Sequence, residues 1–412
     1  DEERSRRAAL LGQLANIYLY TGQLESAMQA GLAACVLWRD LGDDVKQAET
    51  YLDLSFFCHW QGRELESIKY IQSALESLAN HPDQTAIFAK AYAEWGLAAT
   101  VMGAAPEALE KLQRADELHA EIGGNDPFVW VVTLWSKSWC AFLTNSPQRM
   151  LNYALQGVEF CRTSNKPDWE PMMNYSAAWA YMLLGQIPQG QQAAHAALKN
   201  AQLHGVVGAQ GWANLVLSFL AIQEARWDDA REMGDKAYTI GSILHDADLQ
   251  ARVLWSRSVC AGWQNNWEQA ISDILEALQL AKIEGETSLV YPYLLVQAAK
   301  SYFYAGRAEE AQVYLDQAAQ LALERQYRQL PAIAERLQGR IWQAQGKFDE
   351  AQPCFERSLA SLRAIDDVVE YARSEEAYGL YYLDRKQDGD VERGQALLES
   401  ARATFKRLEV NG

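Results

Sequence analysis

The side chains in this sequence that could do acid–base, nucleophilic or metal chemistry are its histidines, its cysteines and its acidic pairs. The histidines show none of the spacings with Cys, Asp or Glu that build a metal site; they are His59, His81, His119, His195, His204 and His245. The sequence contains no Cys-x-x-Cys pair, no Gly-x-Ser-x-Gly elbow and no glycine-rich phosphate loop after a strand. It therefore predicts no catalysis and no metal or cofactor site.

The acidic pairs recur at one fixed offset after a turn, as in Asp228–Asp229, Glu309–Glu310 and Asp349–Glu350. Such recurrence is typical of negative charge placed at helix N-termini, where it interacts favourably with the helix dipole. A general acid–base role is therefore not predicted for these pairs. The cysteines are scattered through apolar helical stretches, which is typical of small core residues in a reducing cytoplasm; they are Cys35, Cys58, Cys140, Cys161, Cys260 and Cys354.

Composition and charge narrow the classes of partner. The formal net charge of −17 argues against nucleic-acid backbones and anionic membranes, because both require a basic face. No apolar run approaches the ~18–20 residues that a membrane span needs. The opening "DEERSRRAALLGQL" reads as an amphipathic helix with no signal peptide. We therefore expect this chain to be part of a longer protein, with a neighbouring domain upstream of Asp1.

A helix-breaking phrase recurs along the whole chain with a period of about 40 residues. Its copies are "TGQLESA" (21–27), "QGRELES" (61–67), "MGAAPEA" (102–108), "TNSPQRM" (144–150), "LGQIPQG" (184–190), "EARWDDA" (224–230), "QNNWEQA" (264–270), "AGRAEEA" (305–311), "QGKFDEA" (345–351) and the looser "RKQDGDVERG" (385–394). The Gly or Asn of most copies can supply the left-handed residue that ends a helix. No stretch of the sequence convincingly predicts a strand.

Small residues recur in two columns, each at a fixed distance from this phrase. Seven residues before each turn stand Ala15, Ser55, Gly96, Ser138, Ala178, Ser218, Ser258, Ala299, Gly339 and Gly379. Twelve residues after it stand Ala34, Ala74, Ala115, Gly157, Ala197, Ala237, Ala277, Ala318, Ser358 and Ala401. Helices approach closely only where side chains are small, so these columns predict the contacts within and between helical hairpins.

The pattern resembles the tetratricopeptide repeat family, whose helix–turn–helix units stack into a right-handed superhelix. The resemblance covers essentially the whole chain and implies an all-α solenoid of about ten repeats in one domain, residues 1–412. The repeats are expected near 4–42, 44–81, 84–123, 126–164, 168–205, 207–245, 247–285, 287–326, 329–365 and 367–410. They are longer than the family's common 34-residue unit. In this they look more like the sensor regions of bacterial signal-transducing (STAND) ATPases and maltose-regulator-type activators.

The resemblance places certain positions of each first helix on the concave wall of the superhelix. In the middle repeats these positions are mostly aromatic: Trp135, Trp139, Phe142, Tyr175, Trp179, Met182, Trp212, Phe219, Trp255 and Trp263, with Met172 beside them. In the later repeats they become basic: Arg252, Lys300, Arg336, Arg340 and Arg373. The first two repeats offer Asn16, Tyr20, Phe56, His59 and Trp60.

Two interpretations of these residues stay open. Large aromatics at helical spacing can simply fill a core, and basic residues can form a solvated face. Alternatively, Trp, Tyr and Arg in one groove are the usual anchors of an interface. On the second interpretation, Trp179→Ala and Trp212→Ala should weaken binding and leave helicity intact.

The sequence thus predicts a non-catalytic sensor region of a larger cytoplasmic signalling protein. Its partner would be a protein or peptide that lays apolar anchors on the aromatics and presents acidic groups to the arginines. A passive protein–protein scaffold and an oligosaccharide sensor that stacks sugars on Trp are the alternatives. Ligand-driven change of superhelical pitch is the expected way to signal to a neighbouring domain.

Overall fold

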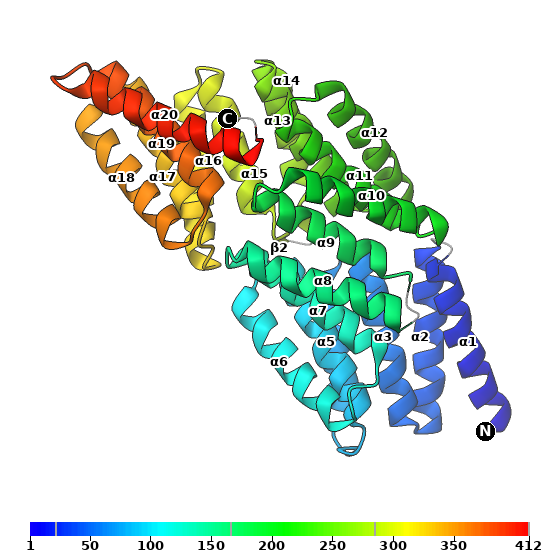
Figure 1. Cartoon of the computed structure of the whole chain (residues 1–412). Helices are drawn as coiled ribbons and strands as arrows, with labels where there is room; N and C mark the ends of the chain where they lie inside the picture. Colours follow the sequence, from blue (N-terminus) through cyan, green and yellow to red (C-terminus); the bar gives the residue numbers. More distant parts are fainter. Residues whose placement is uncertain (21–22, 165–166, 284–285, 411–412) are drawn as a thin grey trace.

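The computed structural model describes residues 1–20, 23–164, 167–283 and 286–410, with the backbone alone at positions 20, 60, 283, 286 and 287. Within these residues, twenty α-helices follow one another as antiparallel hairpins that stack side by side (Figure 1). The predicted all-α, right-handed solenoid of tetratricopeptide type is confirmed. Nowhere in the described part of the chain is a helix long and apolar enough to cross a membrane.

Each hairpin pairs an odd-numbered helix with the even-numbered helix that follows it. The first helices are α1 (Glu2–Tyr20), α3 (Asp44–Trp60), α5 (Thr85–Val101), α7 (Pro127–Leu143), α9 (Glu170–Leu183), α11 (Val207–Gln223), α13 (Ala247–Trp263), α15 (Tyr291–Tyr304), α17 (Leu330–Ala344) and α19 (Val368–Arg385). The second helices are α2 (Leu24–Leu41), α4 (Glu64–Ser77), α6 (Ala105–Glu121), α8 (Pro147–Thr163), α10 (Ile187–Leu203), α12 (Trp227–Leu244), α14 (Trp267–Leu280), α16 (Ala308–Glu324), α18 (Phe348–Ala364) and α20 (Asp390–Leu408).

One connection departs from the sequence prediction. Between α14 and α15, β1 (Lys282–Ile283) and β2 (Glu286–Thr287) form a short antiparallel ladder, so the expectation of no strands was wrong there. The connection is longer than the other inter-hairpin turns, and its backbone polar groups are partly satisfied by pairing with one another. Beyond the ladder, the Leu289 amide donates a 2.8 Å hydrogen bond to the Val101 carbonyl at the end of α5.

The turn residues adopt the conformation that the recurring phrase predicts. The second residue of each described copy has a positive φ, from 48° to 80°, at Gly62, Gly103, Asn145, Gly185, Ala225, Asn265, Gly306, Gly346 and Lys386. The first copy, at residues 21–22, lies outside the described residues. A left-handed residue ends the first helix and lets its last carbonyls accept hydrogen bonds from the turn.

Ala225 is one of the positions where this turn carries a side-chain penalty. Its φ of 54° is strained for an L-residue with a Cβ, and the residue is exposed. Ala225→Gly is therefore expected to raise the free energy of unfolding by about 0.5–1 kcal/mol, measured by urea denaturation with far-UV circular dichroism. The exposed mid-helix control Ala360→Gly in α18 should lower it by about 1 kcal/mol instead. A loss of stability in both variants would contradict this account.

The two small-residue columns are buried at all twenty positions, as predicted. A methyl group added at Gly96 would lie 2.5 Å from Leu112 Cδ2 of α6, and one added at Gly339 would lie 2.9 Å from Phe355 Cζ of α18. Ser218 and Ser258 use their hydroxyls to bond the carbonyls of the partner helix, at Ala230 (2.7 Å) and Ala270 (2.8 Å). These columns therefore fix how closely the helices of a hairpin approach.

The superhelix winds tightly enough for its distant parts to touch. Besides the Leu289–Val101 bond, Arg373 of α19 donates to the Gln223 side chain at the end of α11, 3.4 Å away. Leu408 of α20 packs over Gly185, so that the C-terminal helix lies beside the α9–α10 turn (Figure 1). The concave side is consequently divided into a packed core and separate pockets.

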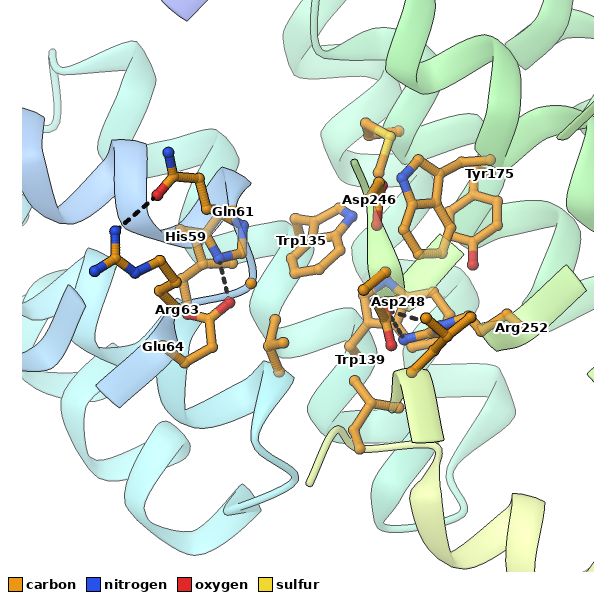
Figure 2. Close-up of a pocket in the computed structure, with 18 of the residues that line it drawn as sticks. His59, Gln61, Arg63, Glu64, Trp135, Trp139, Tyr175, Asp246, Asp248 and Arg252 are labelled. Atoms are coloured by element: carbon orange, nitrogen blue, oxygen red, sulfur yellow. Dashed lines mark hydrogen bonds and ion pairs between the residues drawn. The ribbon is translucent and has the colours of Figure 1, made fainter. Parts of the chain in front are cut away.

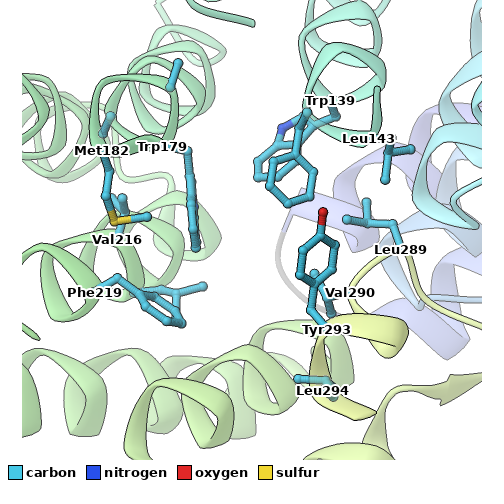
Figure 3. Packing of buried hydrophobic residues seen from close by; sticks show 14 of the residues in the cluster. Trp139, Leu143, Trp179, Met182, Val216, Phe219, Leu289, Val290, Tyr293 and Leu294 are labelled. Carbon is cyan, nitrogen blue, oxygen red and sulfur yellow. The ribbon is translucent and has the colours of Figure 1, made fainter. Parts of the chain in front are cut away.

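The packed part contains a row of contacting aromatic rings in the interior of the superhelix, here called the aromatic column. Figure 3 shows Trp179, Phe219 and Tyr293 among their buried neighbours. Trp179 lies 5.1 Å from Phe219, which lies 5.1 Å from Trp255 (ring centroids). Tyr293 of α15 closes the column, 5.4 Å from Phe142 and 6.0 Å from Trp255. Edge-to-face and tilted ring pairs of this kind stabilise a core beyond their buried area.

Candidate functional site

The central cavity is a partly open pocket of about 300 Å³ on the concave side (Figure 2). It lies between the α3–α4 turn on one side and the start of α13 on the other, about 190 positions apart in the chain. Its lining residues are His59, Gln61, Gly62, Arg63, Glu64, Leu97, Val101, Trp135, Trp139, Trp169, Met172, Tyr175, Trp212, Asp246, Ala247, Asp248, Arg252, Leu280, Lys282 and Leu289. Because the hairpins that supply them meet only through superhelical winding, this cavity is a product of the tertiary structure.

One wall of the central cavity is aromatic. Trp139 stacks on Tyr175 with ring centroids 5.6 Å apart, and its Nε1–H donates to Ser176 Oγ at 3.1 Å. Tyr175 in turn meets Trp212 edge to face at 5.5 Å. Trp135 lies 6.0 Å from Trp139 on the same helix face. These rings offer flat apolar surfaces in fixed orientations.

Arg252 projects into the same wall as a buried cation. Its guanidinium lies over the rings of Trp139 and Trp212, 5.4 and 5.1 Å from their centroids. Its Nε and Nη2 both donate to Asp248 Oδ2 at 2.9 Å, one helical turn earlier on α13. The guanidinium is therefore held by cation–π contacts on two sides and an ion pair on the third.

The polar residues of the lining lie on both sides of the cavity. Glu64, buried at the start of α4, bonds to His59 Nδ1 through Oε1 at 2.9 Å. Burial alone would lower the pKa of His59, but the Glu64 carboxylate and its hydrogen bond raise it. Asp246 caps α13 by accepting from the Leu249 amide at 2.9 Å, and burial raises the pKa of Asp246 to about 6. Figure 2 shows these acids on both sides of Trp135.

Three buried polar atoms on residues of this cavity have no hydrogen-bond partner among the described residues. They are Glu64 Oε2, Asp248 Oδ1 and Trp135 Nε1. An unsatisfied buried polar group costs about 1–3 kcal/mol, so native structures rarely leave several together. The two carboxylate oxygens require hydrogen-bond donors, and the indole N–H requires an acceptor. The arrangement is that of a site for a ligand with an apolar body and donor groups.

The structure distributes the residues predicted for the groove over three environments. Trp135, Trp139, Tyr175, Trp212 and Arg252 line the central cavity. The aromatic column and the core around it contain Phe142, Trp179, Met182, Phe219 and the partly buried Trp255. A second pocket, here called the basic pocket, is lined by Trp263, Lys300, Arg336, Arg340 and Arg373, so Arg252 is separated from the other basic residues. Of the earlier positions, His59 lines the central cavity, while the side chains of residues 20 and 60 lie outside the described part.

Sequence reasoning missed the carboxylates of the central cavity. Glu64 stands two residues after the turn glycine, just before the recurring acidic positions, where the other copies up to residue 351 carry Leu, Ala, Pro, Ile, Trp or Phe. An acidic residue at this otherwise apolar and at least half-buried position was the available signal for it. Asp246 reads in sequence as a helix cap, and it does cap α13. The spacing of Asp248 and Arg252 by four residues predicts an ion pair on one helix face, and this was the available signal for that part of the site.

Behind Glu64, the buried carboxylate of Glu94 in α5 makes folding depend on pH. Burial raises the pKa of Glu94 from 4.5 to about 7, against the opposing effect of Lys90, whose Nζ lies 3.8 Å from Oε1. Between about pH 4.5 and about pH 7, the folded chain therefore keeps a proton on Glu94 that the unfolded chain has already released. The free energy of unfolding consequently falls as the pH rises through this interval. Glu94→Gln should raise the free energy of unfolding at pH 8 by about 1–3 kcal/mol and have little effect at pH 5.

Urea denaturation at pH 5, 6.5 and 8 measures this difference. The control is Glu121→Gln, at an exposed position of α6, which should change stability by less than about 0.5 kcal/mol at each pH. An equal effect of Glu94→Gln at pH 5 and pH 8 would show that the carboxyl stays ionised in the folded chain.

Comparison with known proteins finds similarity at the level of the fold. No protein-family model matches the sequence, and no curated protein does either. The Rap protein complexed with competence and sporulation factor superposes with a TM-score of 0.63, at 12% identity, covering 89% of this chain and 99% of that one. NprR in complex with its cognate peptide NprX gives a TM-score of 0.55 at 14% identity, covering 88% and 99%.

A signal transduction ATPase with numerous domains (STAND) that carries a tetratricopeptide repeat sensor, from Pyrococcus horikoshii, is also similar. Its TM-score is 0.46 at 16% identity, and the match covers 77% of this chain. The chain spans about half the length of that protein, since the match covers 47% of it. At these identities the similarity extends to the tetratricopeptide-like fold alone.

Proposed function

We propose that this chain is a non-catalytic binding domain that encloses part of a peptide or protein partner in its central cavity. The observation that carries the proposal is the set of unpartnered buried atoms, Glu64 Oε2, Asp248 Oδ1 and Trp135 Nε1, on residues that line one cavity. A ligand that pairs these atoms recovers the free-energy cost of burying them without partners. The indole and phenol rings between them add apolar contact area.

The chemistry of the cavity specifies what it accepts. Its volume of about 300 Å³ lies at the lower end of the range for ligand sites, which fits one or two residues of a peptide. An apolar side chain would lie against Trp139 and Trp212, and an amine or amide N–H would donate to Glu64 or Asp248. Arg63, Arg252 and Lys282 line the cavity together with Glu64, Asp246 and Asp248, so the preference for donors is local to the unpartnered oxygens of Glu64 and Asp248. The acidic groups expected of the partner from sequence would instead suit the basic pocket.

Two further features support this proposal. The fold is shared with NprR, which has been seen in complex with its cognate peptide, and with a Rap protein complexed with competence and sporulation factor. All six cysteines are buried free thiols, which favours a reducing compartment such as the cytoplasm. We place the chain, as one superhelical domain, in a larger signalling protein with a neighbouring domain upstream of Asp1.

Ligand binding would change the pitch of the superhelix. The central cavity joins the α3–α4 turn to the start of α13, so a ligand bonded to both Glu64 and Asp248 ties two distant parts of the coil together. Small shifts at each hairpin add up along such a stack. Small-angle scattering of the full chain with and without ligand should therefore show a change in maximum dimension. Superimposable profiles would remove the pitch change from the proposal.

The binding test is a screen of short peptides against the full chain by thermal shift, followed by calorimetry. Peptides that combine an apolar residue with a lysine or a free amino terminus should raise the melting temperature, whereas maltooligosaccharides should not. Glu64→Gln should weaken binding roughly tenfold, since it removes a charged acceptor. The control Glu76→Gln, on an exposed position of the same helix, should bind as the parent does.

Oligosaccharide sensing is the competing function, because sugars also stack on indole rings and donate hydroxyls to carboxylates. A response to maltooligosaccharides that Trp212→Ala abolishes, with no response to peptides, would replace the peptide proposal by this one. No response to either class would favour the passive scaffold.

A further inference from the structure

The basic pocket lies on the first helices of the last four hairpins, apart from the central cavity, with a volume of about 160 Å³. Each of these helices contributes to it: Trp263 from α13, Lys300 from α15, Arg336 and Arg340 from α17, and Arg373 from α19. None of these residues lines the central cavity. The pocket concentrates positive charge on a chain whose formal net charge is −17.

A single buried carboxylate, Glu370, holds two of the four cations in place. Arg336 Nη2 reaches Glu370 Oε2 at 2.6 Å, and Arg373 Nη1 reaches Oε1 at 2.5 Å. Burial alone would raise the pKa of Glu370, but these two guanidinium groups hold it at about 2. Both oxygens of Glu370 are thus engaged, and the two arginines are fixed in orientation.

The other two cations lack a carboxylate partner in the described part of the chain. Arg340 donates to the side-chain oxygen of Gln343 at 3.3 Å. Lys300 makes no hydrogen bond or ion pair there, and its Nζ lies 5.7 Å from the ring centroid of Trp263. Burial, and after it the positive charges of Arg373 and Arg336, lowers the pKa of Lys300 to about 8, although Glu370 and Glu376 act in the opposite direction.

The charge balance leaves room for an anion. Glu376 is the carboxylate on the pocket wall, so with Glu370 the site holds two more positive than negative charges. Like charges held together at a partly buried site are costly unless an anion neutralises them. A carboxylate brings one negative charge, whereas a phosphoryl group brings about −1.5 to −2 at pH 7 and three acceptor oxygens. Guanidinium groups in fixed orientation suit such an oxyanion well.

We propose that the basic pocket binds a dianionic phosphoryl group between Lys300 Nζ and the guanidinium groups of Arg340, Arg336 and Arg373. Trp263 and Tyr304 stand at its edge with 37% and 44% of their surface exposed, and they offer aromatic surface to whatever carries the phosphoryl group. The site is independent of what fills the central cavity. If the basic pocket does not bind phosphate, the peptide proposal for the central cavity is unaffected. If the central cavity does not bind peptides, the phosphoryl proposal is likewise unaffected.

The first test is calorimetric titration of the full chain with inorganic phosphate and with phenyl phosphate, at fixed ionic strength and pH 7.5. Phosphate should bind saturably, and phenyl phosphate should bind more tightly if the flanking rings contact its carrier group. Lys300→Met and Arg340→Met should each weaken binding roughly tenfold or more, since each removes a charged donor. The exposed controls Lys69→Met and Arg402→Met should leave the affinity unchanged.

A second measurement reports on Lys300 directly and does not depend on how well the Met variants fold. Binding of a dianion raises the pKa of Lys300 from about 8, so at pH 8.5 the complex should take up a fraction of a proton. Sulfate is the probe, because it does not titrate in this range. Titrations in buffers of different ionisation enthalpy measure the uptake, and Lys300→Arg should keep the binding and lose the proton uptake.

Three results would overturn the proposal. They are the absence of saturable binding beyond the effect of ionic strength, unchanged affinity in both Lys300→Met and Arg340→Met, and binding of acetate as tight as that of phosphate. The last would assign the pocket to carboxylates. Equal proton uptake by the parent chain and Lys300→Arg would place the titrating group elsewhere.

Discussion

Trp179→Ala is expected to lower the free energy of unfolding by about 3–5 kcal/mol, the range for removing a large buried aromatic side chain. Trp179 is 5% exposed and sits inside the aromatic column, 5.1 Å from Phe219 and 6.3 Å from Trp139 (ring centroids). Its removal would leave a cavity that the neighbouring helices cannot close without moving the small-residue columns. The expectation from sequence, that Trp179→Ala leaves the fold intact and weakens only binding, therefore changes.

Trp212→Ala provides the matched comparison. Trp212 is partly buried and lines the central cavity, so its loss mainly enlarges a space that already exists. We expect this variant to keep more stability than Trp179→Ala and to lose ligand binding. Trp130→Ala, at a 40% exposed indole outside the column, should cost about 1 kcal/mol. Urea denaturation followed by far-UV circular dichroism measures all three, and equal losses for Trp179→Ala and Trp130→Ala would show that the column is loosely packed.

Arg252→Met should have an effect of similar size for an electrostatic reason. Arg252 is 4% exposed, and Asp248 depends on it as an ion-pair partner at 2.9 Å. Removing one partner of a buried pair leaves the other charge uncompensated, which typically costs about 3–5 kcal/mol. The indoles of Trp139 and Trp212 would also lose the cation between them.

The double variant Arg252→Met/Asp248→Leu separates these contributions. With both charges removed, most of the lost stability should return, because apolar replacement of a buried pair is often close to neutral. Lys236→Met is the control, since Lys236 and Glu232 form an ion pair with the same i, i+4 spacing on the neighbouring helix at an exposed site. It should cost less than about 0.5 kcal/mol. If Arg252→Met cost no more than Lys236→Met, the buried ion pair would not be a structural element of the site.

The central cavity and the basic pocket have opposite requirements. The first presents the unpartnered carboxylate oxygens of Glu64 and Asp248 and so selects hydrogen-bond donors. The second presents Lys300 and Arg340 and so selects oxyanions. One ligand that reaches both would carry an amine and a phosphoryl group. Two separate ligands could instead act on the same superhelix and influence one another through its pitch.

The sequence by itself determined the hairpins and their contacts. The left-handed turn residues, such as Gly62 and Gly346, repeat about every forty residues, and so do the small residues of the two columns, such as Ala178 and Ser218. They repeat because every hairpin must end its first helix and pack its two helices closely in the same way. Helix periodicity and turn conformation depend on residues a few positions apart, so one sequence suffices to find them. The resemblance to the tetratricopeptide repeat family implied which positions point inward, and the residue types at those positions are mostly aromatic or basic.

Only the tertiary structure decided what those inner positions face. Trp139 and Trp179 occupy equivalent places in successive hairpins and both belong to the packed core, yet only the first also lines the central cavity. Glu64 became part of a site because α13, far along the chain, winds over it. The reason is geometric, because the small rotation from one hairpin to the next accumulates over many hairpins. The accumulated rotation determines which distant residues meet, and it cannot be read from any single repeat.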